Sequence, residues 1–377
     1  MLAKNHFTHT LEEPKQVSLI ECALEKKINK INLIGFLGSS LAFTASSLIL
    51  KINQPNIFIL KDKESASYFA NDIENLTNKS IFFFPESYKK AYEIEKNDNA
   101  NILLRIELLN KINSTTQPIV ITYPEALVEK VISQKELQKK SINLKVGDNF
   151  QIEELADFLE EMNFVKEDFI LEPGQYAIRG GIVDIYSYSN ENPYRIEFFD
   201  TIIESIRTFE INNQLSIQNE NKIKIIPNTQ LVKTNQNKIC FLEYLPKDTL
   251  IWAEDINYTK NTIKNYFEKI ENKYQKLKSA KQIKYSDPNL LFTNHNEFIK
   301  LIEKFTVIES NNYPYFTPQH EIKLDTELLT RFNKQFNLLK QEMQTHTDQG
   351  IQNIILCASE EQENRFKAIF DRNEKIK

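Results

Sequence analysis

Short, uninterrupted apolar runs alternate with helical patterns over the first third of the chain. Four such runs are bounded by polar or turn residues, at Ile31–Ile34, Ile57–Leu60, Ile81–Phe84 and Ile119–Thr122. Runs of this length are typical of strands that are buried on both faces of a sheet. The segment Leu103–Ile112 has helical periodicity instead. This order predicts an α/β layer with a mainly parallel sheet over residues 1–127.

The pattern changes between residues 128 and 212. An amphipathic helix is predicted over Ile152–Met162, and strands with alternating apolar and polar positions follow between residues 176 and 210. Alternation with a period of two indicates strands that bury one face only. We therefore predict a smaller α+β domain here, with an antiparallel meander.

Residues 213–317 return to isolated elements. The runs Ile223–Ile226 and Leu250–Ala253 predict strands, and a lysine-rich helix is predicted over Tyr258–Lys281. Such a run is most often a solvated surface helix, with contact to DNA as the alternative.

Residues 318–377 predict the start of a further α/β domain. A helix at Leu328–Gln344 precedes an apolar run at Ile351–Cys357 and a second helix. One such αβα unit is too small for a complete layer, so we expect the chain to be a fragment of a longer protein.

Charge and composition exclude several classes of protein. The chain has 47 Lys and Arg against 52 Asp and Glu, a net charge of −5, which disfavours a protein built mainly around phosphate contacts. Its three cysteines have no metal-ligand spacing, so no metal site is predicted and a reducing cytoplasm is expected. The most apolar window, Ile31–Leu50, is interrupted by glycines and serines, so no membrane span is predicted.

Two of the only seven glycines mark a first candidate site. Gly35 and Gly38 lie where a strand gives way to a helix, the context in which a Walker A loop cradles phosphates. The positions of the motif's last glycine, lysine and hydroxyl residue hold Ser40, Leu41 and Ala42. Phosphoryl transfer depends on the lost lysine and magnesium ligand. The loop is therefore a degenerate phosphate loop or an ordinary strand-to-helix turn.

An acidic pair lies where a Walker B strand would present one. Glu254 and Asp255 follow the predicted strand Leu250–Ala253, in the reverse of the usual order. The commoner meaning of such a pair is the N-terminus of a helix. Together with the glycine loop, the pair suggests a degenerate P-loop NTPase-like domain.

The second candidate site lies on the predicted meander. Alternation places Arg195, Glu197 and Phe199 on one face of a strand, opposite an apolar face. An aromatic beside an arginine on a charged face is the composition of an interface hot spot, and Arg179 on a nearby strand extends it. The alternative is that another element covers Phe199 while both arginines pair with Glu197 or Asp184.

Three segments of this region carry a resemblance to a known family. They are GQYAIRGGIVDIY from Gly174, PYRIEFF from Pro193 and SIRTF from Ser205. They resemble the N-terminal region that bacterial transcription-repair coupling factors (Mfd) share with the excision-repair protein UvrB. Weaker similarity covers residues 1 to about 340. The resemblance implies a UvrB-like domain 1a at 1–127, an inserted domain 2 at 128–212 and a domain 1b at 213–317.

The resemblance also implies partners. Domain 2 of the family recruits the damage sensor UvrA, through contact residues that fall on Arg179, Arg195 and Phe199. RNA polymerase, DNA, ATP and magnesium would be bound by parent domains beyond residue 377. In the parent, an ATP-dependent DNA translocase, the C-terminal domain would mask the UvrA surface.

The resemblance finally implies what this segment itself does. The phosphate loop is intact in UvrB and typically decayed in coupling factors, so we expect a binding module with no catalytic residues or cofactor. The alternative is an active nucleotide-hydrolysing and DNA-binding portion of a UvrB-like repair helicase, and Leu41 and Ala42 argue against it. The family reads Phe-Phe-Gly-Asp-Glu after its strand, whereas this chain has Asp200 in place of the glycine.

Overall fold

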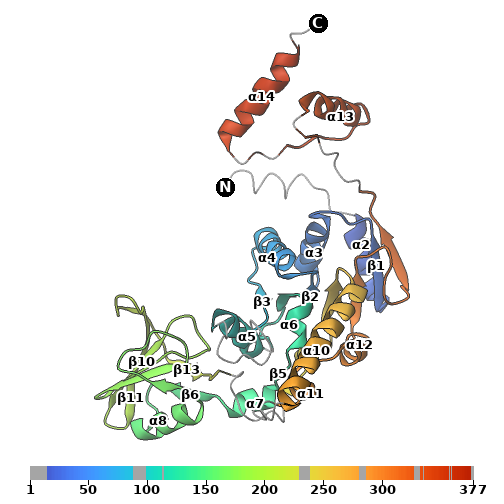
Figure 1. Cartoon of the computed structure of the whole chain (residues 1–377). Helices are drawn as coiled ribbons and strands as arrows, with labels where there is room; N and C mark the ends of the chain where they lie inside the picture. The colour runs from blue at the N-terminus through green and yellow to red at the C-terminus, as the bar shows by residue number, and fades with distance from the viewer. Residues whose placement is uncertain are drawn as a thin grey trace. The chain divides into compact units, whose positions relative to one another are not determined.

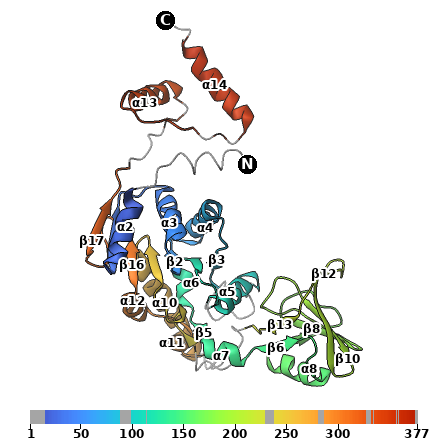
Figure 2. The same cartoon turned by 180° about the vertical axis from the view of Figure 1, so that it is seen from behind.

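The computed structural model describes residues 15–374, except for 88–98, 113, 229–237, 280–285, 327–331, 334, 356 and 358. The chain divides into two compact units, Met1–Asp325 and Thr326–Lys377. Figure 1 and Figure 2 show the chain from opposite sides.

A parallel sheet of seven strands organises the first unit, in the order β17-β1-β16-β15-β2-β4-β3. Its central strands are buried at every position, because helices cover both faces (Figure 1). The predicted runs in the first third form β1, β2, β3 and β4. The strands are β1 (Lys30–Ile34), β2 (Asn56–Ile59), β3 (Phe82–Phe84), β4 (Ile119–Thr122), β15 (Leu250–Ala253), β16 (Thr306–Glu309) and β17 (His320–Lys323).

Helices of the same unit surround this sheet, and their buried side chains form one hydrophobic core with those of the strands. They are α2 (Lys15–Glu25), α3 (Ser40–Lys51), α4 (Lys63–Thr77), α5 (Asn99–Lys111), α6 (Pro124–Val128), α7 (Gln134–Lys139), α9 (Phe241–Tyr244), α10 (Ile256–Ser279), α11 (Pro288–Leu291) and α12 (His295–Ile302). The short strands β5 (Val131–Ile132) and β14 (Lys238–Ile239) pair beside it.

A second sheet, of six strands, lies in the middle of the sequence, in the order β12-β11-β10-β9-β8-β7. All its pairings are antiparallel except that of β7 with β8. The strands are β7 (Val165–Lys166), β8 (Gln175–Arg179), β9 (Ile182–Ile185), β10 (Tyr194–Phe199), β11 (Ile202–Phe209) and β12 (Ser216–Asn219).

One face of this second sheet packs against a helix and two strands. The other, called the open face below, is covered only in part, by Ile170 over Ala177 and Phe209. Helix α8 (Ile152–Glu161) and the pair β6 (Ile142–Lys145) and β13 (Lys222–Ile225) share a core with one side of the sheet. Their core includes Leu155, Leu159, Ile196 and Phe198, which confirms the predicted apolar face of β10. The opposite face carries the charged residues described below.

The ends of this region differ from the division drawn on the sequence. Strands β12 and β13 follow residue 212, yet they pair with β11 and β6. Strand β17 follows residue 317, yet it pairs with β1 in the parallel sheet. Strands β12 and β17 are short and largely polar, so no apolar run marks them. The run Ile223–Ile226 predicts β13, but not that it pairs with β6.

The second unit contains the helices α13 (Phe336–Asp348) and α14 (Glu360–Glu374). The strand predicted over Ile351–Cys357 is a wrong prediction for the residues described there. Residues 351–355 form no strand, and Ile351, Ile354 and Ile355 are exposed. A strand needs a neighbour to complete its backbone hydrogen bonds, and the described part of this unit offers none.

Candidate functional site

The glycine loop between β1 and α3 is packed against the protein's own backbone. Gly35 and Gly38 both have positive φ, of 81° and 58°. A Cβ on Gly35 would lie 2.1 Å from the carbonyl oxygen of Leu324, and the Leu324 amide donates to Ile34 O. Gly35 is therefore required because the segment after β17 approaches it closely.

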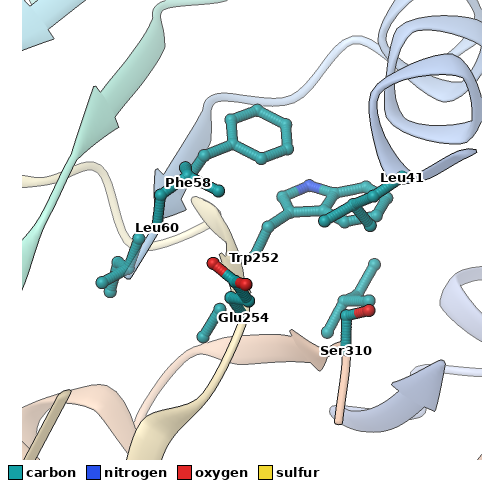
Figure 3. Close-up of a pocket in the computed structure, with 9 residues that line it drawn as sticks. Leu41, Phe58, Leu60, Trp252, Glu254 and Ser310 are labelled. Carbon is teal, nitrogen blue, oxygen red and sulfur yellow. The ribbon is translucent and has the colours of Figure 1, made fainter. Parts of the chain in front are cut away.

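The start of α3 fills the space at the carboxyl ends of the parallel strands. Leu41 points toward Phe58 and Trp252, as Figure 3 shows. The cavity that remains among these side chains is about 10 Å³, room for at most one water molecule. Ala42 is buried, and the Ser40 hydroxyl donates to Leu37 O at 2.8 Å. At the positions of the motif's lysine and hydroxyl residue the loop therefore has two apolar side chains, Leu41 and Ala42.

The acidic pair after β15 is engaged in local hydrogen bonds. Asp255 Oδ1 accepts from the Tyr258 amide at 2.8 Å, so this carboxylate caps the first turn of α10. Glu254 Oε2 accepts from the Lys61 amide at 3.1 Å. Asp255 therefore has the commoner meaning of such a pair, since it lies at the N-terminus of a helix.

Phe199 is at the end of β10 and is 72% exposed. It pairs with Ile202 across a tight hairpin in which Asp200 adopts a φ of 56°. Aspartate is among the few residues other than glycine that tolerate this left-handed conformation. The turn is therefore kept although the family's glycine is absent, and no element in the described part of the chain covers Phe199.

Both predicted arginines converge on one buried carboxylate. Asp184 accepts from Arg195 Nε at 2.7 Å and from Arg195 Nη2 at 2.9 Å, and it also pairs with Arg179. Strand register explains this convergence. Arg195 on β10 lies directly opposite Asp184 on β9, and so does Ala177 on β8; Arg179 is two residues along β8 from Ala177, on the same face. Hydrogen bonding to Asp184 raises the pKa of Arg195 above its ordinary value, so its charge is permanent.

The two arginines differ in how much they offer a partner. The Arg195 guanidinium lies 4.3 Å from the Phe209 ring centroid, donates also to Gln214 and is only 13% exposed. Arg179 is 36% exposed. The alternative interpretation, in which both arginines pair internally and another element covers Phe199, is therefore confirmed for the arginines and wrong for Phe199, which is exposed.

A second ion pair lies beside the first on the same face. Glu197 accepts from Arg207 Nη2 and from the Ser205 hydroxyl, both at 2.6 Å, and the Arg207 bond holds its pKa below the usual range. Arg207 lies directly opposite Arg195. Because Arg195 pairs with Asp184 and Arg207 with Glu197, this like-charged pair is tolerated.

Other candidate chemistry is limited in the part of the chain that is described. No cluster of three metal-ligating side chains occurs among those residues. None of the described helices is long and apolar enough to cross a membrane.

Comparison with known proteins places this face in a described family. Residues 142–231 match the UvrB interaction domain. The Bacillus subtilis transcription-repair-coupling factor is 29% identical over 62% of this chain and 20% of its own length, and the Rickettsia bellii factor is 24% identical over 87% and 31%. UvrABC system protein B of Thermotoga petrophila is 24% identical over 62% of this chain and 37% of its own length.

The chain spans between a fifth and two fifths of the length of these relatives. The match to the interaction domain begins at residue 142, where β6 begins, and includes β12 and β13. The chain therefore contains a UvrB interaction domain and is a homologue of transcription-repair coupling factors and UvrB over most of its length, as its motifs predict.

Proposed function

We propose that this chain is a UvrA-binding module of a transcription-coupled DNA repair factor, and that it binds through the open face of the six-stranded sheet. The observation that carries the proposal is the exposed Phe199 on the same sheet face as an ordered arginine pair. This face lies in the segment that matches the UvrB interaction domain, and UvrB and UvrA are components of one repair system.

The geometry supports binding because the site is organised before a partner arrives. Arg179 and Arg195 are fixed by Asp184, so little side-chain entropy remains to be lost on association. A large exposed aromatic next to such a cation is the usual composition of an interface hot spot. Arg179 and Phe199 are exposed enough to touch a partner, whereas Arg195 acts mainly by fixing Asp184.

We further infer that the parallel-sheet domain is a degenerate P-loop NTPase-like domain that does not hydrolyse ATP. Leu41 and Ala42 stand where lysine and the magnesium ligand are needed, and Leu41 packs beside Phe58 and Trp252. The alternative of an active nucleotide-hydrolysing module has no support from the described residues. An ATPase assay at millimolar MgATP should show no turnover by this chain.

The activities of the whole protein are further proposals. In a parent of the coupling-factor type, this module would deliver UvrA to a stalled RNA polymerase in the cytoplasm. ATP-driven movement on DNA would belong to motor domains outside this chain. A C-terminal domain of the parent would mask the open face, so this fragment should bind UvrA more tightly than the parent does.

The experiment is a calorimetric titration of the chain with UvrA. Phe199→Ala should weaken binding by about 2 kcal/mol or more, roughly 30-fold, because the hot-spot aromatic is lost. Leu215→Ala is the matched control, because Leu215 is similarly exposed but lies between β11 and β12, outside the strands that carry Arg179 and Phe199. Equal affinity of the native chain and Phe199→Ala would contradict the proposed site.

A further inference from the structure

The loop between β7 and β8 presents an aromatic side chain that the motifs do not point to. Phe169 is 64% exposed and Leu171 is 67% exposed, while Ile170 between them is buried. Ile170 packs with Ala177 and Phe209 in a small cluster. The backbone amides of Leu171 and Glu172 also donate to Gln175 Oε1, at 2.7 and 3.0 Å. The loop is thus fastened on its inner side while Phe169 faces outward.

Phe169 contacts the more exposed of the two arginines. The Arg179 guanidinium carbon lies 5.2 Å from the centroid of the Phe169 ring. Arg179 Nη1 donates to the carbonyl oxygen of Asp168 at 3.2 Å, and its Nη2 binds Asp184. A cation within about 6 Å of a ring is attracted to the ring face. The Arg179 guanidinium is therefore held both by the loop, through Phe169 and Asp168, and by the sheet, through Asp184.

Strand register places this pair on the same face as Phe199. Arg179 lies opposite Ile182, and Ile182 lies opposite Glu197, so the three form one row across β8, β9 and β10. Phe199 is two residues further along β10 and shares the face of Glu197. Phe169, Arg179 and Phe199 thus border a continuous strip in which two exposed aromatics flank a cation.

The charge of the strip indicates what it binds. Two guanidiniums share the single buried carboxylate of Asp184, so the positive charge of this cluster exceeds that of its carboxylate. Arg195 is mostly buried, so the charge is accessible chiefly at Arg179. A carboxylate is the complementary group, and apolar neighbours of that carboxylate would cover the rings.

We propose that Phe169 is a further contact residue for UvrA, and that with Arg179 it receives an acidic side chain set in an apolar segment of the partner. This inference rests on the proposed function. Phe169 contributes contact area and also keeps Arg179 in its binding orientation. Phe169 and Phe199 are then the two aromatic anchors of one surface.

The test compares two variants from the same loop. Phe169→Ala should weaken UvrA binding at least tenfold in a titration, whereas Leu171→Ala, which removes an equally exposed apolar side chain, should change it less than twofold. Both positions are at the surface, so both variants should keep the circular dichroism spectrum of the native chain. The loss caused by Phe169→Ala should also fall in an Arg179→Ala background, because the two side chains act as a pair.

The outcomes separate this inference from the proposed function. If the native chain binds UvrA and Phe169→Ala binds equally well, the inference is overturned while the proposed function stands. Equal losses in Phe169→Ala and Leu171→Ala would also overturn it, because the effect would then belong to the loop as a whole. If the native chain does not bind UvrA, both proposals are wrong.

Discussion

The buried carboxylate of Asp184 provides the sharpest test of how the open face is organised. Its side chain is almost completely buried and accepts hydrogen bonds from both Arg179 and Arg195. Asp184→Asn preserves the size of the side chain but removes its charge. Two guanidiniums then face an amide, whose NH₂ group is itself a donor and cannot accept from them.

The structure sets the size of the expected effect. Removing one partner from a fully buried ion pair costs about 3–5 kcal/mol, because the remaining charge is left unpaired. The arginines here are 36% and 13% exposed, so water can solvate part of the lost interaction. We therefore expect Asp184→Asn to lower the free energy of local opening by about 2–3 kcal/mol.

Native-state hydrogen exchange measures this quantity strand by strand. A loss of about 2–3 kcal/mol should speed exchange of β9 and β10 amides roughly 30- to 150-fold. Glu197→Gln is the matched control, because its pair with Arg207 lies on the same face but is more exposed. Glu197→Gln should lower the free energy of local opening by at most about 1 kcal/mol, which speeds amide exchange about fivefold. If Asp184→Asn changes exchange no more than Glu197→Gln does, Asp184 does not organise the face.

Three further predictions follow from the contacts described above. Gly35→Ala should lower the unfolding free energy by more than Gly38→Ala in urea titrations, because both have positive φ but only Gly35 meets backbone within 3 Å; equal losses would contradict this reading. MgATP at millimolar concentration should leave the thermal unfolding midpoint unchanged, and an upward shift would show that nucleotide binds. The Glu197 pKa is lowered by its bond from Arg207, so the pair stabilises the fold above the ordinary glutamate pKa of about 4.3 and loses that effect as pH falls through the lower folded value. The stability difference between native chain and Glu197→Gln should accordingly shrink in acid, and a difference that grows in acid would refute the pairing.

Much of the fold is predictable because its strands are buried on both faces. The four apolar runs of the first third all form parallel strands, and alternation correctly divides β10 into a core face and an open face. Strand β17 escapes prediction because its sequence, HEIK, is short and buries only Ile322. The apolar run at Ile351–Cys357 predicts a strand that residues 351–355 do not form, because hydrophobic residues alone do not supply a neighbouring strand.

The site is predictable only in part, because burial depends on distant residues. Alternation identifies the shared face of Arg195 and Phe199, and the resemblance implies that both contact UvrA. The stacking of Arg195 on Phe209 and its bond to Gln214 come from strand pairing and a loop that no local pattern specifies. Phe169 lies in an irregular loop, and only the three-dimensional contact with Arg179 marks it.

The most direct test of the central claim is a footprint of UvrA on this chain by oxidative surface labelling. We predict that UvrA protects Phe169, Phe199 and their neighbours on the open face, while Leu215 and the helices around the parallel sheet react as they do in the free chain. Protection confined to the parallel-sheet domain or to α13 and α14, with Phe169 and Phe199 still reactive, would contradict the account.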